Sequence, residues 1–225
     1  DINENSVETI QSGNVPQLRA LRLHNGTIYR WNRMCYGITD NKPHMRIECR
    51  YIPAGPSIQD EIANAAFWVG LMKARPENVK KIWEHFDFKD VKSNFFKAAR
   101  SGVESVFVWR GKTISAHDLI KNELLPLAHE GLKNCGFSNE EIYVYLGTIE
   151  KRLSSSTGSQ WQVRNFRNLK KEMNVSDALN ALTEFMHDQQ KQNTAVCAWP
   201  DIQIPASLKK QVANMRIVKQ LMSSD

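Results

Sequence analysis

The stretch HMRIECRYI, residues 44–52, alternates apolar and charged side chains and therefore predicts a β-strand with two different faces. The apolar face would carry Met45, Ile47, Cys49 and Tyr51, and the charged face Arg46, Glu48 and Arg50. Alternate residues of a strand lie roughly 6 to 7 Å apart on one side. The charged face thus presents a row that suits a phosphorylated ligand with its metal, because a carboxylate holds Mg²⁺ and guanidinium groups neutralise phosphate oxygens. A solvated sheet face that simply carries charges is the commoner explanation of such a pattern.

The residues before this strand predict a β-hairpin. Asn25-Gly26 tolerates the positive φ angles of a tight turn, so residues 17–23 and 27–33 are expected to pair around it. In the second of these strands, Arg33 shares a face with the aromatic residue Trp31. Arg33 is then either a clamp for phosphate or carboxylate, or a cation stacked on a ring, and stacking is the commoner role.

The remainder of the chain has mostly helical periodicity. Helices are predicted at residues 57–75, 78–85, 91–101, 115–133, 138–153 and 176–186, with a short strand at 106–109. Pro126 predicts a kink or break inside its helix. Residues 154–159 are expected to form a polar, flexible loop, and residues 207–222 a basic helical tail. Antiparallel strands in the first third followed by a mostly helical remainder indicate an α+β fold.

Composition is typical of a soluble globular protein, with 225 residues, 41% hydrophobic and 24% charged. No stretch approaches the ~20 apolar residues of a membrane-spanning helix, and the polar start resembles neither a signal peptide nor a transit peptide. Four cysteines without CxxC spacing fit a reducing compartment, so we expect a cytoplasmic protein that binds no membrane. The net charge of +6 permits anionic ligands, but no nucleic-acid-binding motif accompanies it, which disfavours nucleic acid as a partner.

Other chemical signatures are weak. The six histidines lack the spacing of a metal site, no cysteine has the local sequence of a nucleophile, and no GxxxxGK[ST] loop is present. His129 could touch a site, although a histidine near a helix end more often bonds a backbone carbonyl.

Several stretches resemble the glutamate–cysteine ligase family 2, the carboxylate–amine ligases. Residues 24–33 (HNGTIYRWNR) are similar to the family's GTIW–WxxR strand, and residues 43–50 are similar to its LRIExR strand. Further similarity lies at residues 53–56, 63–67, 95–102, 125–132 and 157–162. Together these matches cover residues 16–200.

The resemblance implies a glutamine-synthetase-like catalytic fold, present here in part. Such an enzyme phosphorylates a substrate carboxylate with ATP and Mg²⁺, and an amine then displaces phosphate from the acyl-phosphate to form an amide. On that resemblance Glu48 would ligate Mg²⁺, Arg50 would face the transferring phosphoryl group, and Arg33 would bind nucleotide phosphate or substrate carboxylate. Arg46, in the same charged row, is expected to contact substrate or nucleotide. Gln160 and Gln162 match a later loop of the family and are expected to contact ligand.

The chain departs from this family at its beginning. Family members carry an amino-terminal half whose acidic E-x-E strand supplies most of the metal ligands, and nothing before Pro16 matches that strand. We therefore expect a flexible lead-in at residues 1–15, a carboxyl-terminal ligase half at 16–200, and a helical tail or linker at 201–225. The isolated chain is expected to be inactive without its amino-terminal half, and its substrate to be an amino acid or related carboxylate.

Three questions stay open at this level. Residues 216–225 resemble the opening of a cystathionine-β-synthase (CBS) type domain, although an amphipathic terminal helix explains them equally well. A non-catalytic scaffold or interaction domain derived from the ligase fold is the alternative to an enzyme. Self-association as a homo-oligomer is also open, because a sheet edge left by the missing half would favour it.

Overall fold

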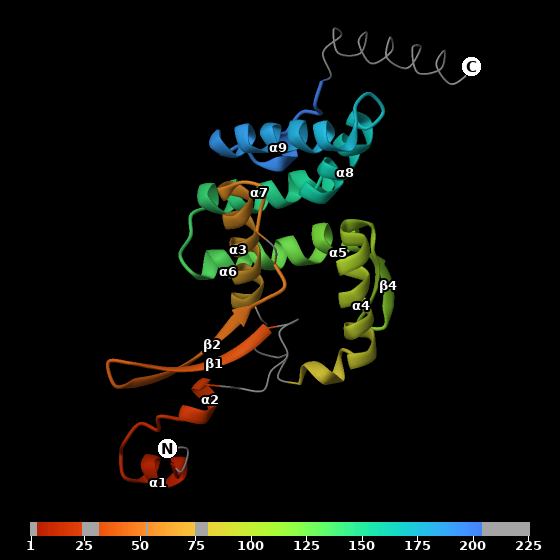
Figure 1. Ribbon diagram of the computed structural model, residues 1–225. Coiled ribbons are helices and arrows are strands. Elements are labelled where there is room, and N and C mark those ends of the chain that lie inside the picture. The colour runs from red at the N-terminus through yellow and green to blue at the C-terminus, as the bar shows by residue number, and fades with distance from the viewer. Residues whose placement is uncertain (1–3, 24–31, 53, 75–80, 204–225) are drawn as a thin grey trace, which may run out of the picture. The chain divides into compact units, whose positions relative to one another are not determined.

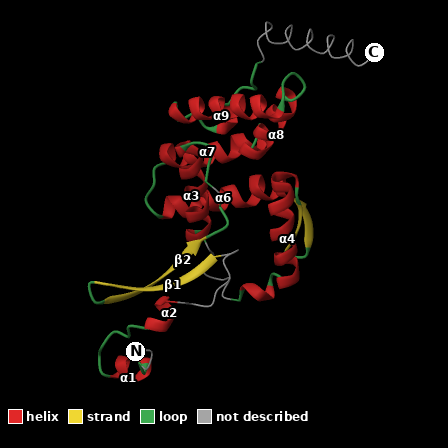
Figure 2. Cartoon of the chain, in the orientation of Figure 1, coloured by secondary structure: helices red, strands yellow, loops and turns green. Residues whose placement is uncertain are grey.

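The computed structural model describes residues 4–23, 32–52, 54–74 and 81–203 (Figure 1). The chain forms two compact units, Asp1–Ala54 and Gly55–Asp225, and each is described by itself. Helices predominate, and the strands pair as antiparallel hairpins (Figure 2). The predicted α+β class is confirmed, whereas the glutamine-synthetase-like topology stays a prediction. In the part of the chain that is described, no helix combines the length and the apolar character needed to cross a bilayer.

The first unit contains a hairpin preceded by short helices. Its elements are α1 (Ser6–Gln11), α2 (Arg19–Leu23), β1 (Asn32–Thr39) and β2 (Lys42–Cys49). Strands β1 and β2 pair along their whole length, from Asn32 opposite Cys49 to Thr39 opposite Lys42. Asp40 and Asn41 close the turn with φ angles of 50° and 58°. Such left-handed angles suit a two-residue hairpin turn, and Asp and Asn tolerate them better than most residues.

The hairpin predicted around Asn25-Gly26 is wrong in its pairing. Residues Arg19–Leu23, expected as its first strand, form helix α2, and Asn32 and Arg33 pair with β2 instead. The segment RALRL consists of strong helix formers, and this local preference prevails over the turn signal. Asn25-Gly26 itself lies outside the described residues. The hairpin turn falls instead at Asp40 and Asn41.

The second unit is largely helical. Its elements are α3 (Ile58–Lys73), η1 (Ile82–Glu84), α4 (Phe88–Ser101), η2 (Gly102–Glu104), β3 (Val106–Trp109), β4 (Lys112–Ser115), α5 (Ala116–Leu119), η3 (Ile120–Leu124), α6 (Leu125–Asn134), α7 (Asn139–Ser154), α8 (Gly158–Leu169), α9 (Val175–Lys191) and η4 (Val196–Ala198). The predicted caps Ser57, Ser115 and Ser138 each accept a hydrogen bond from the first turn of their helix. Gly102 ends α4 with a φ of 52° and a ψ of −128°, a conformation that glycine tolerates.

Two features of this unit differ from, or refine, the sequence prediction. Pro126 lies in the first turn of α6, directly after the π-helical segment η3. Proline has no backbone N–H to donate, and the regular α-helical pattern is interrupted by the wider π-helical turn just before it. Helix α8 begins at Gly158, inside the stretch predicted to be a flexible loop. Thr157 and Gln160 form a capping box there, which supplies partners for the first backbone N–H groups.

The core of the second unit lies where helices cross. Helix α3 packs against α6 and α7 (Figure 1), around the buried residues Ala128, Leu132, Ile142 and Leu146. A second cluster joins α8, α9 and η4 through Trp161, Leu169, Ala178, Leu182, Val196 and Trp199. Asp60 connects α3 to α7, because its fully buried carboxylate lies 2.8 Å from the Arg152 guanidinium. It also accepts a hydrogen bond from the backbone N–H of Val196.

Candidate functional site

Glu48 lies between two arginines on one face of the β1–β2 hairpin. Arg33 is directly opposite it in the register, and Nη2 of Arg33 is 2.7 Å from Oε2 of Glu48. Arg50, two residues further along the chain, places Nε 2.9 Å from Oε1. Both carboxylate oxygens are therefore engaged by guanidinium groups. All three side chains are partly exposed, so the cluster can be reached from solvent.

The surroundings keep Glu48 ionised. The hydrogen bond from Arg50 is the main cause that lowers the pKa of Glu48 below its ordinary value, and the charge of Arg33 adds to it. Cys35, which is buried beside the pair, lies with Sγ 3.6 Å from Oε2 of Glu48. Nε of Arg33 is buried and has no hydrogen-bond partner among the described residues. This N–H group is therefore a donor that an acceptor can reach only if the Arg33 side chain moves.

Arg46 is on the same face but does not join this cluster. Its Nη1 atom is 3.1 Å from Nε2 of His44, and the side chain is exposed. The missing side chain of Gly37, directly opposite His44, provides the space in which the two side chains meet. The charged row predicted at Arg46, Glu48 and Arg50 is therefore present on one face, with its ion pairs confined to one end.

Gln160 and Gln162 belong to the second unit and to different faces of α8. Gln160 accepts a hydrogen bond from the backbone N–H of Thr157 and donates one to Glu104. Two residues along a helix correspond to about 200° of rotation, so Gln162 faces away from Gln160. Any ligand that Gln160 contacts must compete with its capping role. The structure does not bring these two side chains together.

The cluster can supply part of a metal site but not all of its ligands. Glu48 offers a carboxylate, the ligand type that Mg²⁺ prefers. Within the described ranges, no group of three or more His, Cys, Asp or Glu side chains lies close enough to hold a metal ion. Glu48 could therefore supply one ligand, with the rest coming from outside the described residues. The arginines supply charges for phosphate or carboxylate oxygens.

The sequence did not reveal two parts of this arrangement. The pairing of Arg33 with Glu48 was hidden because the predicted hairpin placed Arg33 beside residues 17–23. The contact of Cys35 with Glu48 was not predicted, because a lone cysteine in a strand is more often a small buried apolar residue. Trp31, the ring in the stacking alternative for Arg33, lies outside the described residues.

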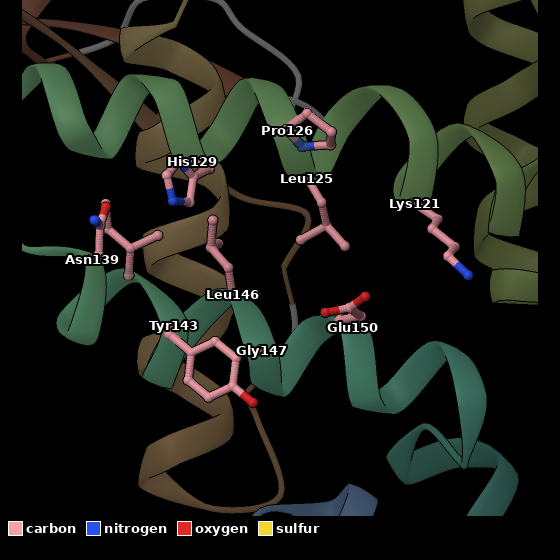
Figure 3. Close-up of a pocket in the computed structure, with 10 residues that line it drawn as sticks. Lys121, Leu125, Pro126, His129, Asn139, Tyr143, Leu146, Gly147 and Glu150 are labelled. Carbon is pink, nitrogen blue, oxygen red and sulfur yellow. The ribbon is translucent and has the colours of Figure 1, made fainter.

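A groove of about 450 Å³ lies in the second unit, between α6 and α7. Figure 3 shows Leu125 and His129 pointing from α6 toward α7, and Glu150 pointing back from α7. Lys121 lies at the end of the groove near Glu150, and Tyr143 lines its α7 side. His129 thus borders a surface groove, and none of the residues assigned a role in ligation lines it.

Comparison with known proteins gives no match: no family model, curated protein or solved structure is similar to this chain. Membership of the carboxylate–amine ligases therefore stays a prediction from the motifs at residues 24–33 and 43–50 and from the later segments. The contacts among Arg33, Glu48 and Arg50 come from the structure and do not depend on sequence similarity.

Proposed function

We propose that this chain is part of an ATP- and Mg²⁺-dependent carboxylate–amine ligase that forms an amide bond through an acyl-phosphate. The observation that supports it best is the placement of Glu48 between Arg33 and Arg50 on one accessible face. Phosphoryl transfer is catalysed mainly by positioning and by neutralising charge, which requires a carboxylate-held metal and arginines rather than a nucleophile. The cluster contains these residue types.

In this proposal the two arginines exchange partners when the nucleotide binds. At rest they neutralise Glu48, which orients both guanidinium groups at low cost. Phosphate oxygens then take over the N–H donors of Arg33 and Arg50, and the unpartnered Nε of Arg33 gains an acceptor. Glu48 would then be free to supply one ligand to Mg²⁺, and the bound ion would neutralise and orient the phosphates. Arg50 faces the transferring group, and Arg33 holds nucleotide phosphate or the substrate carboxylate.

The remaining members of the proposed machinery are assigned by resemblance. Arg46, which is exposed and bonded to His44, would contact the outer part of the substrate or nucleotide. Gln160 and Gln162 would contribute only if the complete enzyme brings α8 to the ligand. The carboxylates that complete the metal site would come from the amino-terminal half expected in such ligases. An amino acid or related carboxylate is the proposed substrate.

One observation favours the alternative, a non-catalytic scaffold. The ion pairs of Glu48 with Arg33 and Arg50 saturate both carboxylate oxygens. Ion pairs that occupy both oxygens can stabilise the pairing of β1 with β2 without any ligand. In a scaffold the arginines would therefore matter for hairpin stability and not for nucleotide affinity.

Calorimetric titration of Mg·ATP into Arg33→Gln and Arg50→Gln variants separates the two functions. A ligase site loses about tenfold or more in affinity with either variant, because each removes a charge-assisted hydrogen bond to phosphate. Arg110→Gln is the matched control, since Arg110 also pairs with a glutamate, Glu123, but at a hairpin of the second unit. Equal affinity in all three variants would support the scaffold and contradict the ligase.

A further inference from the structure

A strongly basic groove lies along helix α8, beside the end of α4. Its volume is about 740 Å³, and its charged lining consists of Arg100, Arg164, Arg167 and Lys171 with a single carboxylate, Glu104. Arg164 and Arg167 are three residues apart in α8, which places them on one face of the helix, and Lys171 lies in the turn that follows it. Arg100 comes from the last turn of α4. Four cations from α4, α8 and the turn after α8 thus line one surface groove.

Part of this charge is already compensated. Asp201 accepts two hydrogen bonds from Nε and Nη2 of Arg164, at 2.9 and 2.7 Å, and Ser156 accepts another from Nη1. The same arginine lowers the pKa of Asp201, so this pair stays ionised at neutral pH. These bonds hold the Arg164 side chain in place at the edge of the groove. Glu104, the acid of the lining, accepts a hydrogen bond from Gln160.

Arg100 and Arg167 differ from Arg164. Among the residues that the structure describes, no carboxylate lies within ion-pair distance of either guanidinium. Both side chains are exposed, and Arg167 belongs to α8, which is anchored by the buried residues Trp161 and Leu169. Ser159 and Asn168 add neutral donors to the same lining. The groove consequently offers several positive charges and few negative ones to a ligand of this size.

We propose that this groove binds an oligophosphate, either free or as the phosphate chain of a nucleotide. Guanidinium groups match phosphate oxygens in a bidentate fashion. A chain of linked phosphates contacts several cations at once, which a singly charged anion cannot do. The groove lies wholly in the second unit, and its lining includes Gln160 but none of Arg33, Glu48 and Arg50. Phosphate binding here therefore does not require the Glu48 cluster.

Titration of inorganic tripolyphosphate into the full chain tests this proposal. Arg167→Gln is expected to weaken binding about tenfold, and Arg100→Gln with Arg167→Gln about a hundredfold. Lys170→Gln is the matched control, because Lys170 ends the same helix but lies outside the groove and over the ring of Phe166. ATP in a parallel arm shows whether a nucleotide binds more tightly than the free phosphate chain.

Several results would overturn the proposal. Absence of tripolyphosphate binding at millimolar concentration is one, and equal losses in Arg167→Gln and Lys170→Gln are another, since they indicate only a general charge effect. Binding of a single-stranded oligonucleotide without binding of tripolyphosphate would assign the groove to nucleic acid instead. A circular dichroism spectrum of each variant checks that its total helix content equals that of the parent.

Discussion

Arg33 and Glu48 lie directly opposite each other on β1 and β2, with Nη2 of Arg33 2.7 Å from Oε2 of Glu48. This cross-strand pair turns a row of charges on β2 into a cluster contributed by both strands. Because the hairpin register determines which residue faces Glu48, a one-residue slip would move Arg33 to the other face. The apolar residues on that other face, Met34, Met45 and Ile47, are exposed in the structure.

The titration of Glu48 provides a first prediction. Its folded-state pKa lies below the ordinary value of 4.5, chiefly through Arg50. A lowered pKa means that the stabilisation is fully present above pH 4.5 and is lost as the pH falls through the folded-state value. In Arg50→Gln the carboxyl resonance of Glu48 should titrate at higher pH than in the parent, as followed by carbon NMR. Arg46→Gln is the control, and an equal shift there would contradict the assigned ion pairs.

A second prediction concerns the buried ion pair between α3 and α7. Asp60→Asn should lower the free energy of unfolding by roughly 3–5 kcal/mol, because it leaves the guanidinium of Arg152 without its counter-charge in a largely buried position. Asp177→Asn, which changes an exposed acid in the first turn of α9, should cost less than about 1 kcal/mol. Urea unfolding measures both. Similar costs would show that burial of Asp60 has no special energetic role.

The crossing of α3 and α6 leads to a third prediction. A Cβ at Gly131 would collide with the backbone oxygen of Gly70, so Gly131→Ala must push the two helices apart. Overpacking of this kind costs about 1–3 kcal/mol or more. In Gly147→Ala the new methyl group meets only ring atoms of Tyr143 at 3.9 Å and beyond, so helix propensity should make that variant neutral or slightly stabilising. Thermal unfolding compares them, and equal melting temperatures would refute the close approach.

Local signals in the sequence predicted much of the second unit. Ser57, Ser138 and Gly102 predicted where helices begin or end, because a cap depends on neighbouring residues alone. Helix α8 was missed even though Thr157 and Gln160 have capping-box spacing, since the surrounding serines were interpreted as a loop. Recognition of that box would also have placed Arg164 and Arg167 on one helix face.

The first unit shows where local reasoning ends. The alternation at residues 44–52 identified β2 and the charged face, but strand pairing depends on residues distant in sequence. Asn25-Gly26 favoured one hairpin, whereas the longer ladder between β1 and β2 closes at Asp40 and Asn41. The alternation therefore predicted Glu48 and Arg50 on one face, while the contact with Arg33 required the structure.

The Mg²⁺ dependence of ATP binding tests the central claim most directly. Calorimetry with and without Mg²⁺ is performed on the parent and on Glu48→Gln, both carrying Arg100→Gln and Arg167→Gln so that the basic groove does not contribute. Glu123→Gln in the same background is the control, because Glu123 also pairs with an arginine.

If Glu48 exchanges its arginines for a cation, Mg²⁺ should strengthen ATP binding in the parent, and Glu48→Gln should lose about tenfold in affinity when Mg²⁺ is present. Without Mg²⁺ the same variant should bind ATP at least as tightly as the parent, since the arginines have lost a competing carboxylate. Failure of the parent to bind ATP, or an effect of Glu48→Gln that is the same with and without Mg²⁺, would contradict a nucleotide–metal role for Glu48.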